Sequence, residues 1–319
     1  MMILVAGSAN VDFVVRAPHI PAPGETVLGH SFATYPGGKG ANQAVASARA
    51  GGAATHMLLA LGDDAYAAPL EASLHAADVQ LHTVRVPGVA TGTAFICVSD
   101  DAENAITVAP GANHALEPGH LPVLDPFSHL LLQLEIPINT VAAYARSARA
   151  AGVTVALNAA PAQALDDDLL ALVDLLIVNE GELASIANHI GTIAQCLERV
   201  RVPVVVVTLG AHGCCASVGG GYLMQPAFPV TPVDTTGAGD TFCGVLVAAL
   251  GEGNGLAAAL RRAAAASALA CTRSGAQSSI PSRDEVAAFL HLQAATSAEQ
   301  LAQIHDFCGL PQPNPNSAA

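Results

Sequence analysis

The stretch "VDTTGAGDTFCGVLVAAL", Val233–Leu250, joins a glycine-rich turn to a helical pattern. Gly237 and Gly239 permit a tight turn, and the pattern that begins near Ala238 is typical of a helix. The first turn of such a helix presents unpaired backbone N–H groups and a partial positive charge, which suit a phosphate group. Asp240 lies in that turn, where it either stabilises the helix dipole or acts as a general base towards a substrate hydroxyl.

A second glycine-rich turn holds the only lysine of the chain. It reads "YPGGKGANQA", Tyr35–Ala44, and every other cationic side chain is an arginine. Gly37, Gly38 and Gly40 suit a backbone that approaches a ligand closely. The turn is neither a Walker loop nor a GxGxxG fingerprint. The first strand likewise leads into "GSANVD" rather than a GxGxxG turn, which argues against a nicotinamide-binding dehydrogenase. Lys39 is therefore either an ordinary solvated lysine or a ligand contact, and both interpretations stay open.

A third signal, "NEGE" at Asn179–Glu182, follows a buried strand directly. Side chains at i and i+3 of a helix start face the same way, so this pair either holds a metal–phosphate complex through water or forms an ordinary capping pair.

The rest of the chain alternates apolar runs of strand length with alanine-rich helical segments. This alternation predicts an α/β fold with a mostly parallel sheet and helices on both faces. The expected strands are "ILVAGS" (3–8), "HMLLALG" (56–62), "HLLLQLE" (129–135), "VTVALN" (153–158), "DLLIVN" (174–179) and "VPVVVVTLG" (202–210). Ligands gather at the carboxyl ends of such strands. The polar residues expected there are Asn10, Asp12, Glu135, Asn158, Asn179 and Thr208.

Two segments break the alternation, about 13–35 and 91–109, and they are expected to form a small separate sheet that acts as a lid or an oligomer contact. Residues 296–308 predict an additional helix without an assigned role. We expect one domain over 1–308 and a disordered, proline-rich tail over 309–319.

Composition excludes several classes of function. The chain is 52% hydrophobic and 12% charged, so it can bury a large core, and a net charge of −14 without a basic run argues against nucleic acid as a partner. The longest apolar run, "VPVVVV", is too short to cross a membrane, and the start of the chain lacks the basic region of a signal peptide. Seven scattered cysteines without a CxxC pair indicate reduced thiols, and we expect a cytoplasmic protein.

In this order and spacing, these motifs resemble the ribokinase family of carbohydrate kinases, also called the PfkB family. The resemblance extends over residues 2 to about 293. It rests on "GSANVD", "PGET", "GGKGANQA", "LNAAPA", "NEGE", "TLGAHG", "DTTGAGDTF" and "TRSGAQSSIP".

The resemblance implies ATP-dependent phosphorylation of D-ribose at O5, with Asp240 as base and the amides of Ala238, Gly239 and Asp240 as an anion hole. Gly237 would complete this catalytic turn. The sugar would be bound by Asn10, Asp12, Gly38, Lys39, Asn42, Glu135 and Asp240. Mg-ATP would be positioned by Asn179, Glu182, Thr208, Gly210, Gly213 and Gly239. A monovalent cation, usually K⁺, would be held by Asp234, Thr236, Ala270, Arg273, Gly275 and Ser279. The family's lid also forms a homodimer contact.

Two alternatives remain beside this one. A sibling kinase would act on deoxyribose, another pentose or a nucleoside, and the sugar pocket discriminates between these. A non-catalytic sugar-binding protein would keep the fold, although the intact Asp240 and its glycines argue against it. The chain also departs from the family at Ala264, where members often carry Asn or His close to the adenine.

Overall fold

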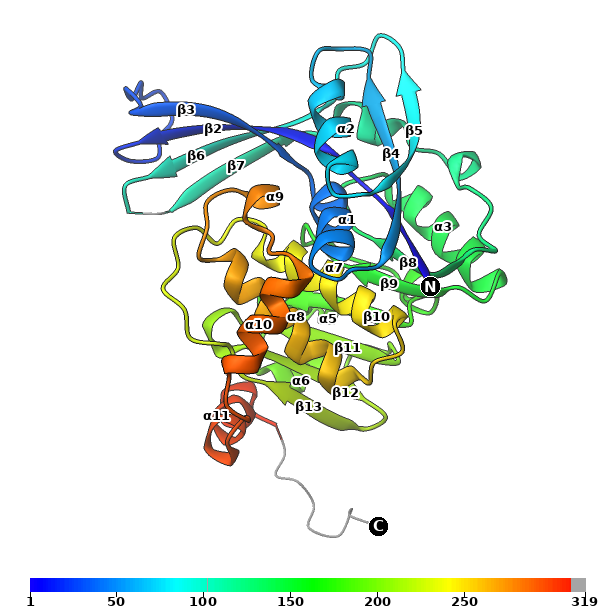
Figure 1. Ribbon diagram of the computed structural model, residues 1–319, viewed down its shortest axis with the longest axis vertical. Coiled ribbons are helices and arrows are strands. Elements are labelled where there is room, and N and C mark those ends of the chain that lie inside the picture. The colour runs from blue at the N-terminus through cyan, green and yellow to red at the C-terminus, as the bar shows by residue number, and fades with distance from the viewer. Residues whose placement is uncertain (102, 311–319) are drawn as a thin grey trace.

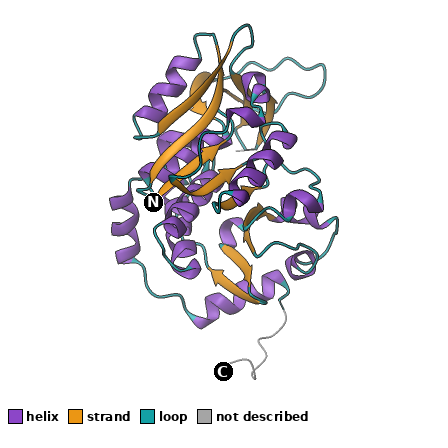
Figure 2. Ribbon diagram, turned by 90° about the vertical axis from the view of Figure 1, so that its right-hand side faces the viewer, coloured by secondary structure: helices purple, strands orange, loops and turns teal. Residues whose placement is uncertain are grey.

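The computed structural model describes residues 1–101 and 103–310. Helices lie on both sides of a large central sheet, and a small sheet projects from it (Figure 1 and Figure 2). Along the large sheet the strand order is β13-β12-β11-β10-β9-β8-β1-β4-β5. Neighbours from β5 to β11 are parallel, whereas β12 and β13 are antiparallel. The bounds are β1 (Met2–Ala6), β4 (Ala54–Gly62), β5 (Gln80–Val86), β8 (Phe127–Leu132), β9 (Thr154–Asn158), β10 (Leu175–Asn179), β11 (Val204–Thr208), β12 (Cys214–Val218) and β13 (Gly221–Gln225).

The central strands are hydrophobic on both faces because each face packs against its own set of helices. Ile3 and Val5 of β1 belong to one buried cluster, and Leu4 and Ala6 to the other. The first cluster includes residues of α1 (Lys39–Arg49), α2 (Ala67–His75), α7 (Ala238–Gly251), α8 (Leu256–Ala270) and α10 (Arg283–Leu292). The second includes residues of α3 (Ile138–Ala150), α4 (Asp167–Leu170), α5 (Glu180–Ala187), α6 (Ile193–Leu197) and α11 (Ala298–Cys308). The α/β prediction is confirmed.

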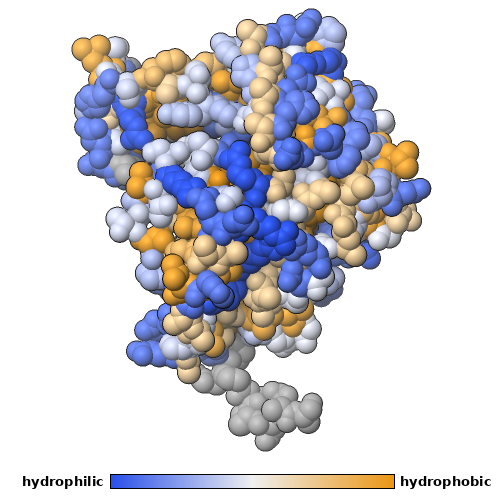
Figure 3. All heavy atoms as spheres, in the orientation of Figure 1, coloured by the Kyte–Doolittle hydropathy of each residue, from blue (hydrophilic) through white to orange (hydrophobic). Residues whose placement is uncertain are grey.

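The small sheet has the order β3-β2-β6-β7, from β2 (Asn10–Ala17), β3 (Ser31–Gly37), β6 (Gly92–Ser99) and β7 (Asn104–Ala109). Its outer pairs are antiparallel and its central pair, β2 with β6, is parallel. Figure 3 shows it projecting at the upper left above the body. The two segments that break the sequence alternation supply these strands. Strand β2 begins at Asn10, so Asn10 and Asp12 lie on the small sheet rather than at the end of a central strand.

Three strands at the two ends of the large sheet were absent from the sequence prediction. Strand β5 is an edge strand with polar residues between its apolar ones, so it lacks the continuous apolar run of a buried strand. Strands β12 and β13 form a hairpin around Gly219 and Gly220, both at positive φ (58° and 79°). That glycine pair is a recognisable hairpin signal.

The remaining short elements are α9 (Ala276–Ser279) and three 3₁₀ turns, at Gly111–Ala115, Pro118–His120 and Gly210–His212. The additional helix expected at 296–308 is α11. Of the tail expected from Gly309, residues 311–319 lie outside the described residues, but Gly309 caps α11 and Leu310 is buried, so these two belong to the folded chain. Among the described residues, no helix is long and apolar enough to cross a membrane.

Candidate active site

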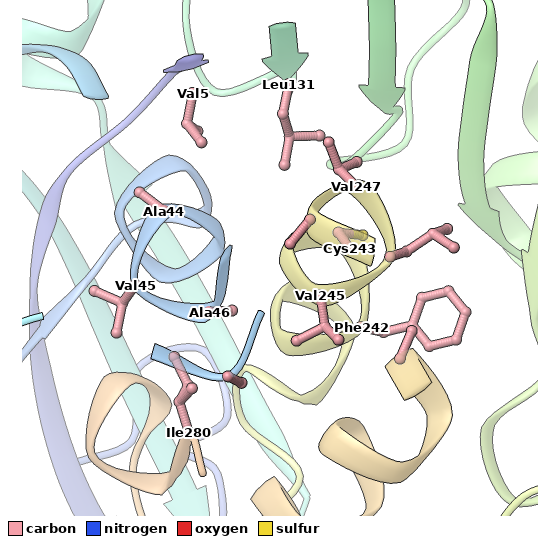
Figure 4. Packing of buried hydrophobic residues seen from close by; sticks show 14 of the residues in the cluster. Val5, Ala44, Val45, Ala46, Leu131, Phe242, Cys243, Val245, Val247 and Ile280 are labelled. Carbon is pink, nitrogen blue, oxygen red and sulfur yellow. The ribbon is translucent and has the colours of Figure 1, made fainter. Parts of the chain in front are cut away.

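The site begins with an unusually close contact between α1 and α7. A Cβ atom placed on Gly244 of α7 would come within 2.4 Å of the backbone oxygen of Gln43 and 2.8 Å of the Ala46 Cβ. Figure 4 shows the small side chain of Ala46 on the side of α1 that faces α7. Only a glycine permits this approach, and it brings the start of α1 to the start of α7.

The Asp240 carboxylate lies where these two helix starts meet, and it is 9% exposed. Asn42 Nδ2 donates to Asp240 Oδ2 at 2.9 Å, and Gln43 Nε2 donates to Asp240 Oδ1 at 2.9 Å. Each carboxylate oxygen keeps a further acceptor position, so Asp240 is oriented but still able to take a proton. Asp240 also lies in the first turn of α7, so both sequence interpretations of it are compatible with this geometry.

Gln43 links Asp240 to a buried amide network that sequence reasoning missed. Its Nε2 also donates to Asn158 Oδ1 at 2.9 Å, and its Oε1 accepts from Gln133 Nε2 at 2.6 Å. Asn158 in turn donates to the Ile177 carbonyl. Asn158 was expected at the carboxyl end of its strand. For Gln133 the available signal was a polar residue inside the apolar pattern "HLLLQLE".

The start of α7 offers free amide donors beside Asp240. The Ala238 amide donates to the Thr235 carbonyl at 3.2 Å, and the Thr241 amide donates to the Gly237 carbonyl at 2.8 Å. Between them, the amides of Gly239 and Asp240 have no acceptor among the described residues. Gly239 is exposed, and the space beside its Cα is open. The N-terminus of α7 therefore presents an accessible pair of amide donors that suit an anion.

Asp12 is a buried carboxylate without a hydrogen-bond donor in the described chain, and it is 8% exposed. Burial, together with the charges of Glu135 and Asp240, raises the pKa of Asp12 to about 7. An acceptor held in this way is available to the hydroxyl groups of a ligand.

Glu135 holds the glycine-rich turn in place. It accepts hydrogen bonds from the Ser8 hydroxyl and, at 3.1 Å, from the Lys39 amide. The Lys39 side chain forms no direct ion pair among the described residues, but its pKa is raised, first by the Asp240 charge and then by those of Glu135 and Glu182. Lys39 is half-buried within the field of the site carboxylates, which is compatible with a ligand contact.

Asn10 and Asn42 complete the polar wall. Asn113, which sequence reasoning missed, donates to Asn10 Oδ1 at 2.7 Å and accepts from the Ala9 amide at 3.0 Å, so it fixes the entry to β2. Asn42 Oδ1 is buried and has no hydrogen-bond partner in the described chain. A cavity of about 390 Å³ adjoins this wall, between one face of the small sheet and the loops that precede α7 and α9. Its lining includes Asp12, Arg16 and Asp234.

The expected nucleotide residues lie at the carboxyl ends of two adjacent strands. Asn179 of β10 pairs in register with Thr208 of β11. Asn179 and Glu182 form a reciprocal capping box on α5, with both hydrogen bonds at 2.8 Å, so the capping interpretation is realised. Burial raises the pKa of Glu182 despite the hydrogen bond from the Asn179 amide. Ala264 lies buried on α8 and offers only a methyl group.

Two of the expected cation residues, Thr236 and Gly275, contact a third, Asp234. Its two carboxylate oxygens accept from the amides of Thr236 and Gly275, each at 2.9 Å, which ties the loop before α7 to the loop before α9. The Arg273 side chain instead pairs with Glu285, so only the backbone of Arg273 is available to a cation. The Ser279 hydroxyl donates to the Ala276 carbonyl. Carboxylate and carbonyl oxygens of this kind are the donors that hard cations prefer.

Comparison with known proteins gives this geometry a family. The chain matches the pfkB family carbohydrate kinase over residues 1–283. It belongs to that family. Ribokinase from Haemophilus influenzae is 38% identical over 300 residues, covering 90% of this chain and 97% of the relative. A solved structure of Arabidopsis thaliana ribokinase complexed with ribose and ATP is 32% identical, with a TM-score of 0.84 and coverage of 91% of this chain and 99% of that one. A deoxyribokinase from Salmonella typhi is 32% identical over 305 residues.

Proposed function

We propose that this carbohydrate kinase transfers the γ-phosphoryl group of ATP to O5 of D-ribose. The observation that carries the proposal is the pairing of a buried, oriented carboxylate, Asp240, with the free amides of Gly239 and Asp240 at the start of the same helix. In-line phosphoryl transfer to a hydroxyl requires a base and an anion site side by side, and the first turn of α7 provides both.

The sugar is held by the polar wall. Asp12 and Asn42 Oδ1 accept from its hydroxyl groups, and Asn10, Gly38, Lys39 and Glu135 complete the pocket. This assignment is supported by the two acceptors that lack partners within the chain, Asp12 and Asn42. A ligand hydroxyl that satisfies them removes the cost of burying an unpaired polar atom.

In the transfer step, Asp240 takes the proton of the 5-hydroxyl while O5 attacks the γ-phosphorus. The new O5–P bond forms as the bond from the γ-phosphorus to the bridging oxygen breaks, and ADP leaves with that electron pair. The free amides of Gly239 and Asp240 face the charge on the transferring group, and Ala238, whose amide donates to the Thr235 carbonyl, holds the turn that presents them. Lys39, which lies within the field of Asp240, Glu135 and Glu182, balances the negative charge between the sugar and the nucleotide.

The nucleotide lies against Asn179, Glu182, Thr208, Gly210, Gly213 and Gly239. Mg²⁺ bound with ATP would neutralise the phosphate oxygens, and Asn179 and Glu182 would orient it. A monovalent cation, K⁺, is assigned to Asp234, Thr236, Ala270, Arg273, Gly275 and Ser279. There it would stiffen the loop that leads into the anion hole. The position is supported by the two hydrogen bonds of Asp234, which connect the loop before α7 to the loop before α9.

The small sheet is proposed to act as the lid and as a homodimer contact. On its outer face Phe13 stacks on both Phe32 and Phe95, with ring centroids 6.1 and 5.3 Å apart. Phe32 is 62% exposed and Phe95 is 54% exposed. A second copy of this sheet would cover the exposed aromatic surface. The proposed location is the cytoplasm, since all seven cysteines are free thiols.

A panel of acceptors tests the function. Coupled-assay turnover with Mg-ATP is measured on D-ribose, 2-deoxy-D-ribose, other pentoses and nucleosides, and the product on ribose is examined for phosphate at O5. The proposal expects the highest kcat/KM on ribose. A higher value on deoxyribose would favour the second candidate, which the deoxyribokinase relatives support. Absence of turnover on every acceptor would favour a binding protein.

A further inference from the structure

Helix α11 lies beyond the part of the chain that matches the family, which ends at residue 283, yet it is firmly attached to the domain. Ile304, Cys308 and Leu310 are buried in the cluster that includes Val207, Leu209 and Cys215 of the β11–β12 region. Ser297 and Gln300 form a capping box at its start, and Gly309 ends it against Thr192 at the start of α6. In Figure 1, α11 lies at the lower left, near β13. A helix anchored at both ends can hold a neighbouring loop in place.

The loop that it reaches is the one that follows β11. The ring of Phe307 stacks on the ring of His212, with centroids 4.0 Å apart and planes 24° apart. Both rings remain accessible, and Phe307 is 41% exposed. Ile304 and Cys308 attach the helix by their burial in the core, whereas the partly exposed Phe307 contributes little to that core.

The backbone of the loop is tightly closed. The Leu209 amide donates to the Gly213 carbonyl at 2.8 Å, the His212 amide to the Leu209 carbonyl at 3.0 Å, and the Gly213 amide to the Gly210 carbonyl at 3.1 Å. Because the turn is closed by its own hydrogen bonds, a contact that orients His212 orients the whole turn.

We propose that Phe307 is a positioning residue for nucleotide binding: by stacking on His212 it holds the Leu209–Gly213 turn in the conformation that binds the nucleoside end of an adenine nucleotide. This inference rests on the proposed function, which assigns the nucleotide to that turn. Ala264 gives the nucleoside no polar side chain from α8, so the placement of this turn carries more of the binding. The extra helix thereby tunes nucleotide affinity without touching the sugar or Asp240.

The test measures nucleotide binding separately from activity. Calorimetry with Mg-ADP gives the Kd, and steady-state kinetics give kcat and the KM values for ATP and ribose. For Phe307→Ala we expect the Kd for Mg-ADP and the KM for ATP to rise about three- to tenfold, which corresponds to the worth of an aromatic pair. The KM for ribose stays unchanged, and Phe307→Tyr, which keeps the ring, restores wild-type affinity.

Two further variants separate positioning from general loosening. Leu292→Ala truncates an exposed apolar side chain at the end of α10 and should leave the Kd unchanged. In a His212→Ala background, Phe307→Ala should have no further effect, because the two rings act as a pair. An unchanged Kd in Phe307→Ala, an equal loss in Phe307→Tyr, or a parallel rise in the KM for ribose would each overturn the inference. If the wild type binds Mg-ADP in a Phe307-dependent way but does not phosphorylate ribose, the proposed function fails and this inference stands.

Discussion

Replacing Asp12 with asparagine should stabilise the protein at high pH but not at low pH. Asp12 is buried, lacks a donor within the described chain and faces the charges of Glu135 and Asp240, so its carboxylate is costly to ionise. The pKa of Asp12 rises from 3.8 to about 7 on folding. Because the folded state then binds more protons than the unfolded state between these two values, the free energy of unfolding falls as the pH rises through that window and levels off above it.

The magnitude follows from the part of the window that the experiment spans. Between about pH 5 and about pH 8, the stability changes only up to the folded-state pKa of about 7, which is an interval of roughly two pH units. At about 1.4 kcal/mol per pH unit, the loss of unfolding free energy is at most about 3 kcal/mol. Asparagine has the same shape but no charge, so this pH-dependent loss should be absent from the variant.

The assay is equilibrium denaturation without ligand at both pH values, for the wild type, Asp12→Asn and the control Asp63→Asn, which alters an exposed carboxylate. The free energy of unfolding of Asp12→Asn relative to wild type should rise by up to about 3 kcal/mol between about pH 5 and about pH 8, and that of the control should not change. An equal difference at both pH values would refute the reasoning. In ribose titrations, the wild-type affinity should fall as the pH drops below about 7, since the protonated Asp12 is a poorer acceptor.

Three other variants probe the scaffold, the lysine and the cation. Gly244→Ala places a Cβ 2.4 Å from the Gln43 carbonyl oxygen, so it should lower the unfolding free energy by about 1–3 kcal/mol and also lower turnover. The control Gly251→Ala, whose Cβ would have no neighbour closer than 3.6 Å, should change neither. Equal melting temperatures for the two variants would contradict the close packing. Lys39→Met should lower kcat about 100-fold or more in the steady-state assay, and bound ribose and nucleotide should protect Lys39 from an amine-reactive label read by mass spectrometry; near-normal turnover would remove Lys39 from the site. Turnover of the wild type should rise with K⁺ over Na⁺, and Asp234→Ala should lose that rise; retained activation would place the cation elsewhere.

The fold could be predicted from the sequence wherever burial left a continuous apolar run. Strands β8 to β11 are covered on both faces and were identifiable, but β5 is an edge strand whose polar residues interrupt the pattern. The hairpin of β12 and β13 carried a usable signal in Gly219 and Gly220.

Site residues could be predicted from the sequence only where they belong to a short local motif. The turn around Lys39 and the start of α7 could be recognised, whereas Gln43 reaches Asp240 through a contact between helices about 200 positions apart in the chain. The roles of Gln133 and Asn113 depend on contacts that span 90 and 103 positions of the chain. Local spacing also left the side chain of Arg273 unassigned, and the structure pairs it with Glu285.

Turnover of D-ribose with Mg-ATP by the wild type and by Asp240→Asn, measured beside ribose binding by calorimetry, tests the central claim most directly. The account predicts that the wild type phosphorylates ribose, that Asp240→Asn binds ribose with nearly unchanged affinity, and that its kcat falls by several orders of magnitude, because the base for the 5-hydroxyl is lost. An Asp240→Asn enzyme with near-normal turnover would contradict the account.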